Sequence, residues 1–132
     1  MIKSNLRLLD ANLNRLREGI RVVEDIYRYV FNDKNIATQL KKIRHNSRIS
    51  EYNALLDSRD ITNDVLKHSI HSEQNREDLT SILIANFKRA QESSRVLEEF
   101  TKLIDIETSE KFKFIRYELY HLEKSILMHK QK

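Results

Sequence analysis

The sequence of 132 residues contains no cysteine, no proline and a single glycine, Gly19. Without cysteine the chain has no disulfide, no thiolate metal site and no cysteine nucleophile. One glycine is too few for a glycine-rich phosphate loop or a dinucleotide-binding fingerprint. Because glycine and proline usually mark turns, their scarcity favours long helices joined by short polar loops.

Long apolar stretches are also missing. The sequence has no apolar signal region at its N-terminus and no apolar run of membrane-spanning length, so we expect a cytoplasmic protein without a membrane partner. Hydrophobic residues make up 39% and charged residues 33%, which is typical of a small globular protein. The length fits one helical domain over residues 1–132. The net charge of +4 suits an anionic ligand, but it is too weak and too evenly spread to indicate nucleic acid.

Hydrophobic spacing predicts an all-α antiparallel bundle of four main helices. Apolar residues that alternate in steps of three and four predict a first helix over 5–30, capped by Ser4, and a second from about 36 towards 56. A third helix is expected to start near Ser72 or Asn75 and to run to about 104. Thr108 or Ser109 would cap the fourth. The predicted core stripes are Leu9, Leu13, Leu16, Ile20, Val23, Tyr27 and Val30; Ile36, Leu40 and Ile43; Leu79, Leu83, Phe87, Ala90, Ser94 and Leu97; and Phe112, Ile115, Leu119, Leu122 and Ile126.

An internal repeat runs through the chain. The stretch 11–25 returns as 85–99, and both copies carry Ala-Asn, an Arg three residues after the Asn, a Glu, Arg-Val and two carboxylates. The offset is 74 residues here and 72 residues between 40–45 and 112–117. The sequence therefore predicts a duplicated helix hairpin, with halves of about 5–56 and 73–128 and an irregular linker over 57–72. Two such hairpins can pack about a pseudo-twofold axis that brings matching residues together.

The repeated polar residues suggest chemistry on anions. On a helical wheel, Asn12, Arg15 and Gly19 lie beside the core stripe, as do their counterparts Asn86, Arg89 and Ser93. Guanidinium groups bind phosphate oxygens in a bidentate manner, and carboxylates beside them supply the oxygen ligands that Mg²⁺ prefers. The structural alternative is an exposed ladder of ion pairs at spacings of three and four residues.

Other candidates have weaker support. Glu118 and His121 have the spacing of half a di-iron site, but no second Glu-x-x-His occurs. His68 and His71 lack an evident third ligand. Tyr120 could pack in the bundle or stack on a base.

The motifs resemble those of a known family. The opening Arg7-x-x-Asp10-Ala11-Asn12-x-Asn14-Arg15-x-Arg17-Glu18-Gly19-x-Arg21-Val22-x-Glu24-Asp25 is similar to the signature of small hydroxymethylpyrimidine-phosphate kinases of thiamine biosynthesis. These occur alone or fused to thiamine-phosphate synthase. The resemblance continues through Arg44-His45, Arg59-Asp60, Asp64-Val65, the second repeat and Arg116-Tyr117-x-x-Tyr120. Its extent implies the standalone form.

The resemblance implies that the protein uses ATP and magnesium to convert hydroxymethylpyrimidine monophosphate to the diphosphate. The four repeated arginines are then the expected catalytic residues: Arg15 and Arg89 would hold phosphates, and Arg21 and Arg95 would support them or neutralise the transferred group. Substrate would bind to Asn12, Asn86, Arg44, Arg59, Arg116 and Tyr120. The expected magnesium ligands are Glu24, Asp25, Glu98 and Glu99.

The sequence leaves a rival class open, namely a non-catalytic accessory or regulatory module that acts with thiamine-phosphate synthase. It also leaves the number of subunits open, a homo-oligomer included.

Overall fold

The computed structural model describes residues 2–130, and these residues form helices without any strand. The predicted all-α class is therefore confirmed. The elements in chain order are α1 (Lys3–Asp25), the π-helix η1 (Ile26–Val30), α2 (Lys34–Asn46), α3 (Tyr52–Ser58), α4 (His71–Gln74), α5 (Leu79–Phe100), the 3-10 helix η2 (Thr101–Leu103) and α6 (Ile106–Lys130).

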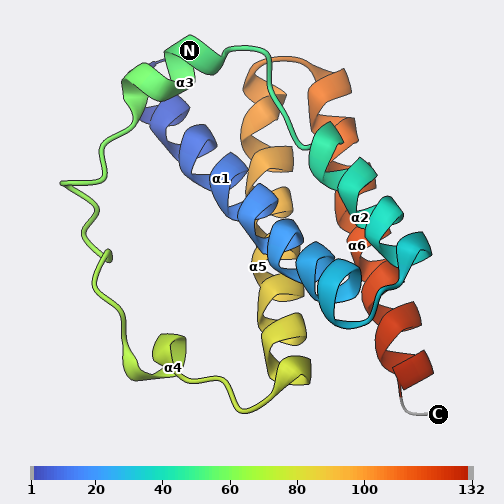
Figure 1. Cartoon of the computed structure of the whole chain (residues 1–132). Helices are drawn as coiled ribbons and strands as arrows, with labels where there is room; N and C mark the ends of the chain where they lie inside the picture. The colour runs from blue at the N-terminus through green and yellow to red at the C-terminus, as the bar shows by residue number, and fades with distance from the viewer. Residues whose placement is uncertain (1, 131–132) are drawn as a thin grey trace.

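Two helix hairpins pack against each other through their first helices. α1 lies against α5, α2 packs on α1, and α6 packs on α5 (Figure 1). The short helix α3 also packs on α1. This is the predicted bundle of four main helices, with the α1–α2 hairpin in one half and the α5–α6 hairpin in the other.

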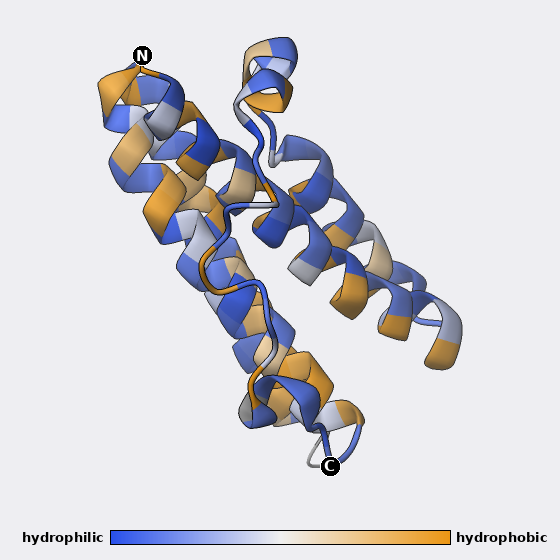
Figure 2. Cartoon of the chain, turned by 90° about the vertical axis from the view of Figure 1, so that its left-hand side faces the viewer, coloured by the Kyte–Doolittle hydropathy of each residue, from blue (hydrophilic) through white to orange (hydrophobic). Residues whose placement is uncertain are grey.

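The core consists of the predicted apolar stripes. Along each helix, apolar and hydrophilic residues alternate with helical periodicity, as the colours in Figure 2 show. Nearly every residue of the four predicted stripes is buried, including Leu16, Leu40, Leu83 and Phe112, which have no exposed surface. The exceptions lie near helix ends, where Val30 and Leu79 are exposed and Ile36 is half-buried. No helix among residues 2–130 is long and apolar enough to cross a membrane.

Several predicted helix ends are wrong. The first helix begins at Lys3 after Ile2, not after a Ser4 cap. The second ends at Asn46, and Tyr52–Ser58 forms a separate helix instead of its continuation. The third begins only at Leu79, where the Asp78 carboxylate accepts a hydrogen bond from the Ser81 amide at 2.8 Å.

The start of α6 shows why its cap was misplaced. The Thr108 amide donates to the Asp105 carboxylate at 2.7 Å, so Asp105 caps this helix. Ser109 is buried, and its hydroxyl donates to the Glu98 carbonyl of α5 at 2.8 Å. A serine expected to cap α6 therefore joins it to α5.

An irregular linker over residues 59–78 joins α3 to α5, includes only the single turn of α4, and extends beyond the predicted linker of 57–72 (Figure 1). In Figure 2 it crosses in front of the helices. Two arginines attach its first part to α1: Arg7 donates to the Asp60 carbonyl at 2.9 Å, and Arg59 forms an ion pair with Asp10. The linker thereby passes beside the polar face of α1.

Candidate functional site

Helices α1 and α5 come into close contact at Gly19. A Cβ atom at this position would lie 3.0 Å from the backbone oxygen of Asn86 and 3.4 Å from the Cβ of Ala90. No side chain larger than hydrogen fits without a shift of α5. The crossing thus sets the Gly19 segment of the first repeat against the Asn86 segment of the second.

A cavity of about 500 Å³ opens beside this crossing. We refer to it as the central cavity. Its lining contains five pairs of residues, each related by the 74-residue offset, and one linker residue: Asn12 and Asn86, Arg15 and Arg89, Glu18 and Glu92, Gly19 and Ser93, Val22 and Val96, and Glu73 of α4. Matching residues of the two repeats therefore lie at one cavity.

The two asparagines are held alike. Asn12 donates its amide to the Leu8 carbonyl at 3.0 Å, and Asn86 donates to the Ile82 carbonyl at 2.9 Å. Both side chains are buried. Each hydrogen bond fixes the amide group on its own helix and leaves the amide oxygen as an acceptor at the cavity wall.

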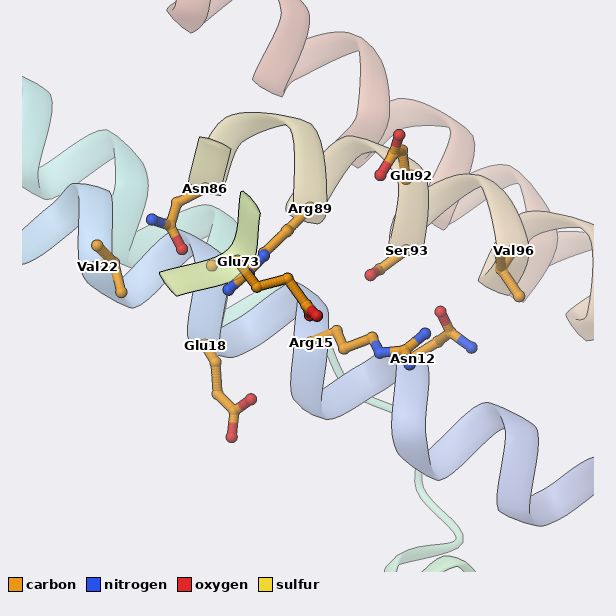
Figure 3. Close-up of a pocket in the computed structure, with 11 residues that line it drawn as sticks. Asn12, Arg15, Glu18, Val22, Glu73, Asn86, Arg89, Glu92, Ser93 and Val96 are labelled. Carbon is orange, nitrogen blue, oxygen red and sulfur yellow. The ribbon is translucent and has the colours of Figure 1, made fainter. Parts of the chain in front are cut away.

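The charges at the central cavity are mixed. Arg15 and Arg89 lie between the helices, while Glu18 and Glu92 point away from each other at opposite edges (Figure 3). Glu73 extends in front of the opening from α4. Two guanidinium groups and three carboxylates therefore share one opening, and the two guanidinium groups are suitable donors to phosphate oxygens.

Two of the predicted magnesium ligands, Glu24 and Glu98, form ion pairs with arginines. Glu24 is 1% exposed and accepts two hydrogen bonds from Arg44, at 2.6 Å and 3.1 Å. Glu98 is buried and binds Arg116 at 2.8 Å in the second half. The hydrogen bond to Glu24 raises the pKa of Arg44. In each half, an ion pair thus joins the long helix to the next helix of its hairpin.

The remaining predicted charged residues pair along their own helices. Arg21 lies 3.3 Å from Asp25, and Arg95 lies 3.7 Å from Glu99. None of the four lines the central cavity. The structure therefore does not bring the four predicted magnesium ligands together, and no group of three or more metal-ligating side chains occurs among residues 2–130. Their metal role stays a prediction.

Arg59 lies in a second cavity, of about 410 Å³, which shares Asn12 and Arg15 with the first. We refer to it as the adjacent cavity. The Arg59 guanidinium binds Asp10 at 2.8 Å and 2.9 Å, and this hydrogen bond is the main cause of its raised pKa. The two cavities form neighbouring compartments along the polar face of α1.

Arg116 and Tyr120 are not at either cavity. The Arg116 guanidinium lies 5.1 Å from the centre of the Tyr117 ring and 5.7 Å from that of Tyr120. Its pKa is raised by contacts with Tyr120 and Glu98. These residues form an aromatic and ionic cluster on α5 and α6.

Three residues of the central cavity, Glu18, Glu92 and Glu73, are not among the predicted site residues. Glu18 and Glu92 are related by the same offset of 74 residues as the selected arginines, so the repeat itself contained the signal. Glu73 had no such signal because it has no repeat partner at the cavity. Only the path of the linker places it there.

Residues 7–125 match the ThiD2 family. Three proteins named thiamine-phosphate synthase are similar to the chain. The one from Nostoc punctiforme is 36% identical over 126 residues, covering 95% of this chain and 36% of the relative. The one from Thermosynechococcus vestitus is 38% identical over 125 residues, covering 92% and 35%. The one from Rhodopirellula baltica is 39% identical over 120 residues, covering 87% and 32%.

The chain spans about a third of the length of these relatives. No solved structure matches it. The match over residues 7–125 includes both repeats and the linker, and hence all residues of the central and adjacent cavities except Ser4. The chain therefore belongs to the ThiD2 family, a domain of thiamine biosynthesis that it shares with these synthases.

Proposed function

We propose that this protein transfers the γ-phosphoryl group of ATP to hydroxymethylpyrimidine monophosphate and forms the diphosphate that thiamine-phosphate synthase consumes. The observation that carries the proposal is the central cavity, where two arginines from equivalent positions face one opening. Family membership supports the pathway, and the residues at the cavity support the type of reaction.

The reaction brings two negatively charged molecules together. A phosphate oxygen of the pyrimidine substrate attacks the γ-phosphorus of ATP, the new P–O bond forms, and the bond to the bridging oxygen breaks as ADP leaves. Because that phosphate oxygen is already ionised at neutral pH, no strong general base is needed. Positioning and charge stabilisation supply most of the catalysis in phosphoryl transfer.

Arg15 and Arg89 are suited to this task. Each would bind phosphate oxygens through its planar guanidinium group, Arg15 from the first repeat and Arg89 from the second. Asn12 and Asn86 offer their amide oxygens as acceptors, which suits the exocyclic amine of the pyrimidine or of adenine. The near-equivalence of the halves gives two similar half-sites, one for each phosphorylated molecule.

Magnesium would enter the cavity together with the phosphate groups, because it is usually bound by substrate phosphates, water and one or two carboxylates. Glu24 and Glu98 already bind arginines, and no three carboxylates of residues 2–130 gather for a metal, so a single carboxylate among Glu18, Glu92 and Glu73 would contact the ion, directly or through water. Bound magnesium would neutralise part of the phosphate charge.

The test is ADP formation from ATP and magnesium with hydroxymethylpyrimidine monophosphate, and with the unphosphorylated alcohol as the control substrate. We expect ADP only with the monophosphate. Folded protein that forms no ADP with either compound would exclude the kinase.

A second candidate is an accessory module for thiamine-phosphate synthase. The observation that favours it is that the relatives bearing this name are about three times as long as the chain. Such a module should change the rate of a separate synthase on mixing. A kinase should instead act on its own substrate in the absence of the synthase.

A further inference from the structure

A third cavity, of about 390 Å³, lies between α1, α3 and the loop that joins α2 to α3. We refer to it as the lateral cavity. Its lining includes Arg17, whereas Arg15 lines the central cavity. At 3.6 residues per turn, these arginines lie about 200° apart around α1. The lateral cavity therefore opens on a different side of the helix.

The lateral cavity has an excess of positive charge. Three arginines line it, Arg17, Arg48 and Arg59, with a single carboxylate, Asp10. Arg59 binds Asp10 in a bidentate manner. Neither Arg17 nor Arg48 forms an ion pair among the described residues 2–130. Two positive charges are thus left uncompensated.

Arg17 is the most unusual of these residues. Its Nε atom is buried and has no hydrogen-bond partner among the described residues. Burial lowers the pKa of its guanidinium, and the nearby charges of Arg48 and Arg44 lower it further. A buried donor without an acceptor is costly, so the group is placed for a partner that the protein itself does not supply.

The second half of the molecule shows that the fold does not require this arginine. Gln91 occupies the position equivalent to Arg17 at the offset of 74 residues. Its amide is buried and donates to Glu123 of α6 at 2.9 Å. The equivalent position in the second half thus holds a neutral side chain that has a hydrogen-bond partner within the protein. At this pair of positions, the unpaired cation is found in the first half.

We propose that the lateral cavity is a binding site for the phosphate group of a phosphorylated small molecule, separate from the central cavity. Two uncompensated guanidinium groups match the charge of a phosphate dianion, and each planar guanidinium group can donate two hydrogen bonds to its oxygens. Leu13, Ile49 and Leu55 form an apolar wall, and Tyr52, an exposed residue, lies at the same site. This wall suits a flat, apolar part of the ligand.

The site has a direct connection to the catalytic face. Arg59 and Asp10 line both the lateral and the adjacent cavity, and the adjacent cavity shares Arg15 with the central one. An anion that draws Arg59 towards the lateral cavity would weaken its pair with Asp10.

The test uses the nitrogen-15 and proton signals of the arginine Nε–H groups, recorded without ATP or magnesium. Inorganic phosphate and phenyl phosphate are the two probes. Both should shift the Arg17 signal saturably, and phenyl phosphate should bind at least threefold more tightly because its ring contacts the apolar wall. If phenyl phosphate binds no more tightly than inorganic phosphate, the proposal that the ligand has an apolar organic part is wrong.

Two variants separate the cavities. Arg17→Gln, which copies the second half, should weaken phosphate binding at least tenfold at the lateral site without lowering the melting temperature in phosphate-free buffer. The double variant Arg15→Met/Arg89→Met should leave the Arg17 response unchanged. Loss of the response only in that double variant, or a folded state that depends on Arg17, would overturn the proposal.

Discussion

Arg15 and Arg44 both belong to the repeated pattern, yet their surroundings give them different tasks. Arg15 is exposed at the central cavity and has no ion-pair partner among the described residues. Arg44 is 12% exposed and binds a nearly fully buried carboxylate. At the residue scale, burial and pairing therefore separate the groups available to a ligand from those that hold the bundle together.

Replacement of the cavity arginines should lower activity without loss of the fold. We expect Arg15→Met and Arg89→Met each to reduce kcat/KM about 100-fold or more, because each removes a charged donor to phosphate oxygens. Steady-state ADP formation measures the effect. Lys113→Met, at an exposed position of α6 that lines neither the central nor the adjacent cavity, is the matched control. Wild-type kinetics in either arginine variant would contradict the assignment.

Replacement of Arg44 should lower stability instead. Arg44→Met leaves the buried Glu24 carboxylate without its partner, which costs about 3–5 kcal/mol of unfolding free energy. Arg21→Met removes an exposed pair with Asp25, which is worth about 0.5 kcal/mol. Urea unfolding of the two variants gives the comparison. Similar free energies for both would show that the buried pair contributes no more than the exposed one.

At the scale of the helices, the close crossing of α1 and α5 shapes the central cavity. Gly19 permits the contact, and Ser93 occupies the equivalent place on the other helix. Capping also acts at this scale. Asp78 begins α5 and Asp105 begins α6, so the helices of the second half start at carboxylates.

The Gly19→Ala variant tests the crossing. Its Cβ would lie 3.0 Å from the Asn86 backbone oxygen, so α5 must shift, which costs about 1–3 kcal/mol. Alanine regains about 1 kcal/mol of helix propensity, so we expect a net loss of about 1 kcal/mol. The same shift moves Asn86, so KM should rise. Ser93→Ala, which adds no bulk, is the control. If Gly19→Ala is more stable than the wild type and has the same KM, a methyl group fits between α1 and α5 and the contact is not tight.

The Asp105 cap gives a pH dependence. The hydrogen bond from the Thr108 amide lowers the pKa of Asp105 below its ordinary value of 3.8. A folded-state pKa below the unfolded one stabilises the protein above pH 3.8, and this contribution is lost as the pH falls through the folded value. Asp105→Ala should therefore lower the melting temperature at pH 7.

The difference between Asp105→Ala and the wild type should shrink as the pH falls through the lowered pKa of Asp105, because the wild-type carboxylate then becomes protonated. Asp105→Asn keeps a capping oxygen but does not titrate, so it should retain most of the stability at pH 7. A pH-independent difference for the alanine variant would mean that the charge of Asp105 plays no part in the cap.

At the scale of the whole molecule, two hairpins place equivalent residues at one opening, and the linker adds Glu73 to it. A ligand that binds there contacts both halves and should stabilise the bundle as a unit. Magnesium, a non-hydrolysable ATP analogue and the pyrimidine monophosphate together should raise the unfolding free energy by about 2.7 kcal/mol at 100-fold excess over Kd. Thermal unfolding detects this gain.

The same ligands should not stabilise the Arg15→Met/Arg89→Met double variant. An accessory module without a substrate site would show no gain in either protein. Equal gains in both proteins would place the binding site elsewhere.

The sequence by itself determined the helices, the core stripes and the repeat. Periodic apolar residues such as Leu9, Leu83 and Phe112 must be buried together, and this requirement depends only on local order along the chain. The helix ends were less predictable. Ser109 has the chemistry of a cap, but its hydroxyl has a partner on α5.

Only the tertiary structure decided which repeated carboxylates line the central cavity. Glu18 and Glu24 are six residues apart, so they lie about 240° apart around α1. Glu24 faces α2 and binds Arg44, whereas Glu18 faces the central cavity. Periodicity shows that the two side chains face different directions. Which direction meets another helix depends on how the hairpins pack, and that packing is set by contacts between residues far apart in the sequence.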